Sequence, residues 1–335
     1  MIREAIDKAV RKVDLTQQEM TQVFEEIMSG MATPIQVGAF ITALRMKGET
    51  VDEITAAVKV MRTKASTIDL GAEEDVIDTC GTGGDVSHTF NISTTAAFIL
   101  AGCGIKVAKH GNRGVSSQCG SADVLEELGV RIDLQPYRVK ECIEKIGIGF
   151  MFAPLFHGAM KYAVEPRKQI GIRTIFNILG PLSNPAGANY QVIGVYRPEV
   201  MENMAKVLLN LGTKAAMIVH SEDGLDEISL SAKTRITQLK NKRVSTYYVQ
   251  PKNFGLRRSD LVAIQGGSKE VNAAIILNIL KGQRGPARDV AVMNASAALV
   301  IMENARDFAD GVKIASESVD SGQALEKLEL LKHEK

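Results

Sequence analysis

Apolar residues in the first part of the chain recur at helical spacing and are interrupted by signals for helix starts. Thr16 and Glu19, and again Thr50 and Glu53, have the spacing of a capping box. After each pair, apolar residues follow three and four positions apart, which is the repeat of a helix with one buried face. The pattern predicts short antiparallel helices and no strands over residues 1–70, forming a small all-helical lobe.

From about residue 75 the pattern changes to short apolar runs that alternate with helical stretches. This alternation is typical of a mainly parallel central sheet flanked by helices, so the predicted fold class is α/β: a small helical lobe plus a large α/β lobe. Strands are predicted over residues 75–79, 105–109, 131–134, 190–196 and 215–220, with helices over 93–101, 122–128 and 198–211. Residues 161–185 are expected to be helical, and a hairpin is expected around Asn241-Lys242, between strands over 234–239 and 244–249.

Two polar runs follow directly after two of the predicted strands. They are Gly81-Thr82-Gly83-Gly84-Asp85 and Lys109-His110-Gly111-Asn112-Arg113. Glycines let a backbone approach a ligand closely, and several amide groups can then face one anion. The glycine run alone is equally compatible with a tight turn. Because the carboxyl ends of parallel strands open on one crevice, however, both runs should meet there, and together they predict a site for a phosphorylated sugar or nucleotide.

Composition and charge exclude several classes of function. The chain has 335 residues, 45% of them hydrophobic, with a net charge of +1 and no Trp, so we expect no nucleic-acid partner. No apolar run has the length of a membrane span and the N-terminus lacks the apolar core of a signal peptide, so we expect no membrane association. The four cysteines lack Cys-x-x-Cys spacing and are expected to be reduced thiols in a cytoplasmic protein.

Six stretches of the sequence resemble the anthranilate phosphoribosyltransferase family, and they occur in the family's order. They lie at residues 78–85, 89–94, 107–113, 120–125, 173–182 and 224–227, the last reading Gly224-Leu225-Asp226-Glu227. The resemblance implies the fold shared by nucleoside phosphorylases and such transferases. Residues 162–186 would then return to the helical lobe of residues 1–70, while residues 71–161 and 187–335 would form the α/β lobe that binds the phosphoribosyl donor.

The resemblance also implies an activity and its partners. The 5-phosphoribosyl group of phosphoribosyl pyrophosphate would be transferred to the amine of anthranilate, giving N-(5-phosphoribosyl)anthranilate and pyrophosphate. This is the second step of tryptophan biosynthesis from chorismate. The cofactor would be Mg²⁺, as one ion or two, and the protein would form a homodimer through the helical lobe.

The residues implied for this activity lie in the matching stretches, apart from Arg167 and the segment after Arg113. The donor site would consist of Gly81, Gly84, Asp85, Thr89, Asn91, Ile92, Ser93, Thr94, Lys109, His110, Gly111, Asn112, Arg113, Gly114, Val115, Ser116, Ser117 and Ser121. The anthranilate site would consist of Gly81, His110, Asn112 and Arg167. Ser93, Asp226 and Glu227 would hold Mg²⁺.

The chemistry of these residue types agrees with the implied reaction. Mg²⁺ prefers oxygen ligands and keeps contacts to substrate phosphates, which suits Asp226 and Glu227. The planar fork of an arginine such as Arg167 matches the two oxygens of a carboxylate. An aniline nitrogen is neutral and already nucleophilic, so no general base is assigned, and catalysis is expected to rest on positioning and on stabilising the leaving group.

Two other functions are alternatives on the same fold. A pyrimidine nucleoside phosphorylase would carry a Lys-His-Ser-Thr-Gly-Gly-type run, and the sequence has none. A non-catalytic paralogue that binds nucleic acid is disfavoured by the near-zero net charge and by the presence of Arg167 and Asp226-Glu227. Two departures from the family pattern are Gly158, where proline is common, and Gln118, where a lysine is common; the second predicts weaker donor binding.

Overall fold

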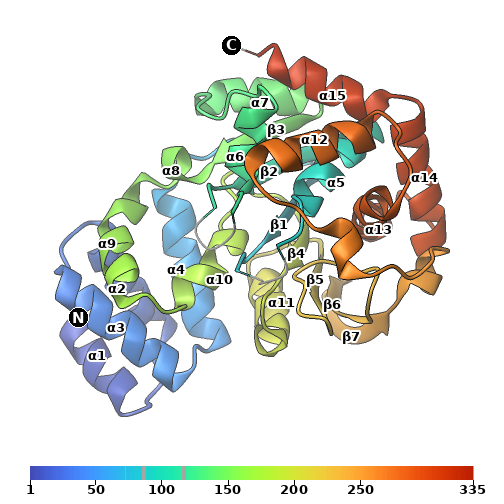
Figure 1. Ribbon diagram of the computed structural model, residues 1–335. Helices are drawn as coiled ribbons and strands as arrows, with labels where there is room; N and C mark the ends of the chain where they lie inside the picture. The colour runs from blue at the N-terminus through green and yellow to red at the C-terminus, as the bar shows by residue number, and fades with distance from the viewer. Residues whose placement is uncertain (72, 85–87, 115–117, 335) are drawn as a thin grey trace.

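The computed structural model describes residues 1–71, 73–84, 88–114 and 118–334, and its chain folds into a small group of helices beside a larger part built on a sheet (Figure 1). The small group begins with the blue helices α1 (Ile2–Val10), α2 (Gln17–Met28), α3 (Pro34–Lys47) and α4 (Val51–Lys64). The green helices α9 (Lys161–Ile170) and α10 (Ile175–Leu182) pack against them, although they come much later in the sequence.

Both predicted capping boxes are confirmed. The backbone N–H of Glu19 donates to Thr16 Oγ1 over 3.2 Å, and the Glu19 carboxylate accepts from the N–H of Thr16 over 3.0 Å. Thr50 and Glu53 make the same reciprocal pair at the start of α4. These caps satisfy amide groups that a helix start leaves without partners, so the helices begin where the sequence predicts.

The central sheet is mainly parallel, as predicted. Its strand order is β3-β2-β1-β4-β5-β6-β7. The first five strands in this order are parallel to one another, whereas β6 pairs antiparallel with β5 and β7 pairs antiparallel with β6. The strands are β1 (Val76–Gly81), β2 (Lys106–Gly111), β3 (Ile148–Phe152), β4 (Tyr190–Gly194), β5 (Ala215–Ser221), β6 (Thr234–Lys240) and β7 (Arg243–Val249). The chain winds from β1 towards β3 and then returns to the other side of β1 with β4, so the winding direction reverses between β1 and β4.

Helices cover both faces of the sheet. On one face lie α5 (Ile92–Gly102) and α13 (Pro286–Ile301), with α12 (Lys269–Leu280), α14 (Phe308–Asp320) and α15 (Gln323–Lys332) packed outside or beside them. On the other face lies α11 (Met201–Asn210), which also contacts α4. The apolar core of the small helical group therefore continues through α11 to Ile193 and Ile218 of the sheet. Shorter helices α6 (Ser121–Glu127), α7 (Pro136–Lys145) and α8 (Ala153–Phe156) lie on either side of β3 in sequence.

The strand predicted over residues 131–134 is wrong. These residues pair with no strand. The strand that lies next to β2 at this edge of the sheet is β3, which comes after α7 in the sequence. Ile132 and Leu134 are buried while Arg131 and Asp133 are exposed. An extended loop that packs every second side chain on the core has the same alternation as a strand, so the pattern alone could not distinguish the two. The helix predicted over residues 122–128 is α6, which begins one residue earlier at Ser121, with Gly120 in the capping position.

The predicted hairpin is confirmed in detail. β6 and β7 pair antiparallel from Thr234↔Val249 to Lys240↔Arg243, which leaves Asn241 and Lys242 as a two-residue turn. Their φ angles are +51° and +57°, the left-handed values that a tight hairpin of this length requires at both central residues. The asparagine tolerates this conformation better than most residues, which is why the dipeptide is informative in the sequence.

The α/β fold class is thus confirmed, while the lobe boundaries stay a prediction. Within the described ranges of the chain, no helix is long and apolar enough to cross a membrane.

Glu53 allows a test of how the small helical group is held together. Its buried carboxylate accepts hydrogen bonds from the N–H groups of Leu15 and Thr50 and from Lys47 Nζ, at 2.9, 2.8 and 2.9 Å. Glu53→Ala should lower the free energy of unfolding by about 3 kcal/mol, because it leaves buried donors and a buried cation short of a partner. Urea unfolding would measure the loss. Glu25→Ala, which removes a half-exposed pair with Lys64, should cost below about 1 kcal/mol, and equal losses would contradict this account.

Candidate functional site

The glycine-rich loop leaves the sheet at the point where the winding reverses. Gly81 ends β1 and lies in register with Gly194, which ends β4. Gly83 and Gly84 have φ angles of +63° and +83°, which side chains other than that of glycine rarely adopt. In open sheets of this kind, ligands bind in the crevice outside the carboxyl ends of the strands at such a reversal. Asp85, the last residue of the predicted loop, lies outside the described residues.

Lys109 lies under this crevice with its ammonium group buried. Only 2% of the residue is exposed, and Nζ donates to the carbonyl oxygen of Thr79 and lies 3.5 Å from Ser93 Oγ. Burial lowers the pKa of Lys109, and attraction to Asp78 opposes that change. The Thr79 hydroxyl in turn donates to the carbonyl oxygen of Ser93 at the start of α5, over 3.0 Å. The cation is therefore fixed between β1 and a helix N-terminus, where phosphate also binds well.

Asp78 is a buried carboxylate that the sequence reasoning did not assign to the site. Its two oxygens accept hydrogen bonds from Asn184 Nδ2 over 2.7 Å and from the backbone N–H of His110 over 3.3 Å. Asn184 also donates to the carbonyl oxygen of Ala108 in β2 over 2.9 Å. Burial raises the pKa of Asp78, while Lys109 and these hydrogen bonds lower it. The sequence did contain a signal for Asp78, namely a charged residue within an apolar strand, because such a residue is rarely buried without a partner.

The three residues implied for the metal are brought together. The N–H of Ser93 donates to Glu227 Oε1 over 3.1 Å, which ties the loop after β5 to the start of α5. Asp226 lies against both strand-ending glycines: a Cβ on Gly81 would come within 2.9 Å of Asp226 Oδ2, and one on Gly194 would collide with the Asp226 carbonyl oxygen. A side chain at position 194 would meet the backbone of the carboxylate-bearing loop, so Gly194 is what lets this loop approach the sheet so closely, while Gly81 leaves room for the Asp226 carboxylate.

This donor set suits Mg²⁺. Two carboxylates and one hydroxyl are oxygen ligands, and the ion completes its shell with water and phosphate oxygens. Across the parts of the chain that the structure describes, no group of three or more His, Cys, Asp or Glu side chains is arranged to hold a metal by itself. The residues present therefore fit an ion shared with a phosphorylated ligand.

Asn91 connects the site to the C-terminal part of the chain. Its Nδ2 donates to the carbonyl oxygen of Cys119 over 3.1 Å, and its Oδ1 accepts from Asn272 Nδ2 over 3.0 Å. Thr89 forms an isolated bridge with Gln265 in the same region. Ile92 and Thr94 are buried, so mainly their backbone remains for a ligand. Asn272, on α12, was missed because no motif marks it.

Arg113 is committed to the protein rather than open to a ligand. Its guanidinium pairs with Asp123 over 3.1 Å and with Glu126 over 2.8 Å, and these hydrogen bonds raise its pKa. Asp123 also accepts from the N–H of Gly114 over 2.8 Å. The Ser121 hydroxyl donates to the Asn112 carbonyl oxygen over 3.4 Å and lies where a Cβ on Gly111 would fall. These contacts fasten the turn after β2 to α6.

The three other donor-site candidates in this turn are Val115, Ser116 and Ser117, and they lie outside the described residues.

His110 faces a second histidine, His157, to which the sequence reasoning assigned no role. The rings of His110 and His157 lie 5.1 Å apart, and the Nε2 atom of each is buried with no hydrogen-bond partner among the described residues. Burial lowers the pKa of His110 to about 3 and that of His157 to about 4. Both imidazoles are therefore neutral at ordinary pH, and each keeps a ring nitrogen for a polar ligand.

Arg167 stands apart from the other candidates for anthranilate. It lies on α9 with its guanidinium over the ring of Phe176, 5.2 Å from the centroid, and burial lowers its pKa. Among the residues with described positions, no hydrogen bond or ion pair joins Arg167 to Gly81, His110 or Asn112. A partly buried arginine without a carboxylate partner is suited to binding an anion from outside the chain.

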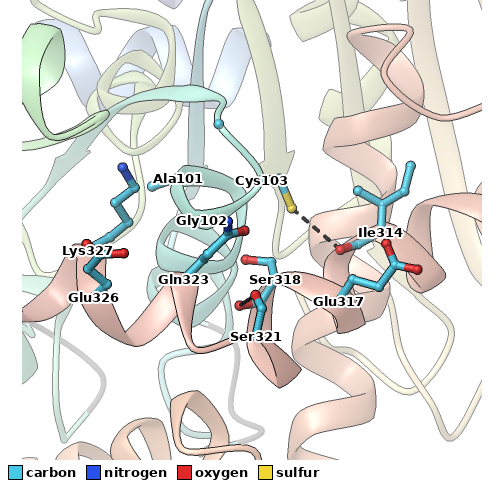
Figure 2. Close-up of a pocket in the computed structure, with 11 residues that line it drawn as sticks. Ala101, Gly102, Cys103, Ile314, Glu317, Ser318, Ser321, Gln323, Glu326 and Lys327 are labelled. Carbon is cyan, nitrogen blue, oxygen red and sulfur yellow. Dashed lines mark hydrogen bonds between the residues drawn. The ribbon is translucent and has the colours of Figure 1, made fainter.

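A separate cavity of about 520 Å³ lies at the far end of α5 (Figure 2). It is lined by the last turn of α5, by Glu317 and Ser318 of α14 and by Glu326 and Lys327 of α15. Cys103 Sγ lies 3.8 Å from the carbonyl oxygen of Ile314 in its wall. Because α5 rises about 1.5 Å per residue, roughly 15 Å separates this cavity from Ser93, and the two sites are distinct.

Two family models match the chain over nearly its whole length. Residues 73–325 match the α/β domain of a glycosyl transferase family, and residues 3–65 match that family's helical bundle domain. The fold, with its glycine loop and clustered oxygen ligands, is therefore that of this class of transferase.

Relatives and solved structures narrow the class. An anthranilate phosphoribosyltransferase of Geobacter sulfurreducens is 54% identical, with 99% of this chain and 98% of the relative aligned. The Thermus thermophilus enzyme of that name has a TM-score of 0.92 at 39% identity, covering 98% of both chains. The enzyme from Saccharomyces cerevisiae, solved with phosphoribosyl pyrophosphate and Mg, has a TM-score of 0.89 at 28% identity, covering 98% and 96%. The chain belongs to the anthranilate phosphoribosyltransferase family.

The neutral histidines predict a loss of stability in acid. Below about pH 6.5 the unfolded chain binds a proton at each histidine, whereas folded His110 does not until about pH 3. The free energy of unfolding should therefore fall as pH falls, by about 2 kcal/mol at pH 5 from His110 alone. Urea unfolding at pH 7 and pH 5 would show that the free energy of unfolding falls less in His110→Gln than in the wild type over this interval. His333→Gln, at an exposed position, is the control, and equal acid sensitivity in all three proteins would refute the assignment.

Proposed function

We propose that this protein transfers the 5-phosphoribosyl group from phosphoribosyl pyrophosphate to the amine of anthranilate. The products are N-(5-phosphoribosyl)anthranilate and pyrophosphate, in the second step of tryptophan biosynthesis from chorismate. The observation that carries the proposal is the meeting of Ser93, Asp226 and Glu227 beside the glycine-rich loop and buried Lys109. Membership of the family supports it, since relatives matched over their whole length carry this name.

The donor carries its charge on two groups, and the site offers a partner for each. Backbone amides of the glycine-rich loop and of the start of α5 suit phosphate oxygens, and Lys109 adds a compact positive charge. Ser93, Asp226 and Glu227 would hold Mg²⁺, which, when bound, neutralises charge on the leaving pyrophosphate. The remaining donor contacts are proposed for the other donor-site residues predicted above, except that the side chain of Arg113, paired with Asp123 and Glu126, would hold the turn after β2 rather than bind the donor.

The acceptor is proposed to bind between Arg167 and the buried histidine. Arg167 would pair with the ortho carboxylate, because a guanidinium matches its two oxygens. His110 stays neutral near pH 7 because burial lowers its pKa to about 3, so it would position the acceptor through a hydrogen bond rather than take its proton. As the bond between C1 and pyrophosphate breaks, the amine nitrogen bonds to C1 and then releases its proton to solvent or to pyrophosphate. The rate gain would come from holding the two substrates together and from stabilising the leaving group.

Three further properties are part of the proposal. A homodimer formed through the small helical group would cover its exposed apolar side chains, among them Met31, Ile35 and Met46, which are 68%, 84% and 78% exposed. The protein would act in the cytoplasm, which suits its four free thiols. Residues 162–186 would belong to the helical lobe of residues 1–70, as their packing on α2, α3 and α4 supports.

The loss of anthranilate fluorescence in the presence of phosphoribosyl pyrophosphate and Mg²⁺ tests the reaction. Turnover should stop with a chelator, and Asp226→Asn with Glu227→Gln should lower kcat/KM about a hundredfold or more, because the ligands for the metal lose their charge. Glu222→Gln, an exposed change in the same connection between β5 and β6, should leave turnover unchanged. Chelator-resistant turnover would reject the metal site, and no turnover by folded wild type would reject the function.

Arg167→Ala tests the acceptor site. The KM for anthranilate should rise about tenfold to a hundredfold, because the loss of a charge-assisted pair to a carboxylate costs about 1.5–3 kcal/mol. Steady-state kinetics with each substrate varied in turn would measure it. Lys168→Ala, the exposed neighbour on α9, should have little effect. A rise confined to the KM for the donor would contradict this assignment and would place Arg167 in the donor site.

A further inference from the structure

Arg173 belongs to none of the predicted sets of site residues, yet it contacts the glycine-rich loop directly. It stands in the short segment between α9 and α10, and its Nη2 donates a hydrogen bond to the carbonyl oxygen of Gly84. Its guanidinium also lies over the ring of Tyr196, with 3.8 Å between the guanidinium carbon and the ring centroid. A segment that packs with the small helical group thus reaches across to the loop that faces the proposed donor.

Tyr196 is itself tied to the same loop. It follows β4, and its backbone N–H donates to Thr82 Oγ1 over 3.2 Å, while the N–H of Thr82 donates to the Gly194 carbonyl oxygen over 2.8 Å. The loop is therefore fastened to the end of β4 at Thr82 and to Arg173 at Gly84. The ring of Tyr196 orients the arginine, since a guanidinium is attracted to an aromatic face.

Gly84 suits this arrangement through its backbone conformation, through the absence of a side chain and through its carbonyl oxygen. Its φ angle is +83°, and a Cβ there would collide with the guanidinium of Arg173. Its carbonyl oxygen carries partial negative charge, which would oppose an anion bound in the same loop. Arg173 binds that oxygen and adds a positive charge at the same place.

We infer that Arg173 is a positioning residue for the phosphorylated donor. It fixes the glycine-rich loop through the Gly84 carbonyl, and its stacking on Tyr196 fixes the arginine. The identity of the donor rests on the proposed function, whereas the fixing of the loop does not. The role is distinct from that of Arg167, which is proposed for the acceptor.

Arg173→Ala should raise the KM for phosphoribosyl pyrophosphate about tenfold to a hundredfold, the range expected for loss of a charged hydrogen bond and a cation–π contact. The KM for anthranilate and kcat at saturating donor should change less than about twofold, because the residue acts on the loop. Arg173→Lys keeps the charge but not the planar stack, so it should not restore the wild-type value. Arg306→Ala, at an 87% exposed side chain, is the control.

Tyr196 separates positioning from general stability. Tyr196→Phe keeps the aromatic face and should retain the wild-type KM, whereas Tyr196→Ala should resemble Arg173→Ala. The double variant should be no worse than either alone, since the two residues act as one unit. If thermal melting shows that Arg173→Ala does not fold, the comparison of Tyr196→Phe with Tyr196→Ala tests the inference in its place. Equal KM values for the donor in these two variants would then contradict it.

Hydrogen exchange of a peptide that covers residues 81–84, measured without substrates, tests the loop independently of the reaction. Exchange should be faster in Arg173→Ala than in wild type. An inactive wild type with this difference would reject the proposed function but keep the loop role. Unchanged exchange, an unchanged KM for the donor, or an effect confined to anthranilate would overturn the inference.

Discussion

The close approach of Asp226 to the ends of two neighbouring strands is the constraint on which the site depends. Gly81 and Gly194 lie in register, and a Cβ on either would occupy space that Asp226 uses. With both side chains absent, the loop after β5 reaches across β4 to β1, and Glu227 then meets the N–H of Ser93 at the start of α5. The carboxylates, the helix N-terminus and the glycine-rich loop thus share one crevice because Gly194 leaves room for the Asp226 backbone and Gly81 leaves room for its carboxylate.

Burial determines the charges around that crevice. Lys109 and Asp78 are both buried and oppose each other's pKa shifts, so neither charge stands alone. The pKa values of the paired histidines fall instead, because burial disfavours the charged form of each ring and the positive charge of Lys109 adds to the effect at His110. Charged groups in a water-poor site interact strongly with a bound anion, while neutral rings suit an uncharged amine. The same physical cause, desolvation, therefore has different outcomes that depend on the neighbours.

Local signals in the sequence sufficed for much of the fold and part of the site. The capping boxes at Thr16 and Thr50 and the turn at Asn241 depend on residues a few positions apart, and all were predictable. The motifs after β1 and β2 were expected to meet because parallel strands align their carboxyl ends. The extended segment around Ile132 was misread because its alternating burial resembles that of a strand without having a strand partner.

The contacts that the sequence could not reveal join distant segments. Asn184 reaches Asp78 across 106 positions, and Arg173 reaches Gly84 across 89. Nothing in the local pattern distinguishes such an asparagine or arginine from a solvated one, since only the tertiary fold supplies the partner. A charged residue inside an apolar strand, such as Asp78, does carry a signal, because its burial requires a partner, but the sequence does not say which partner.

The hydrogen bond between Asn91 and Asn272 has a consequence for how the protein is made. The two residues are 181 positions apart, so the ribosome completes the stretch that contains Asn91 long before it adds α12. Until then, Asn91 lacks the partner that fixes its amide, and the bridge from Thr89 to Gln265 is likewise missing. A nascent chain that already contains every glycine of the loop therefore still lacks the contacts that hold Thr89 and Asn91 in the folded protein, and these contacts become available only in the final quarter of synthesis.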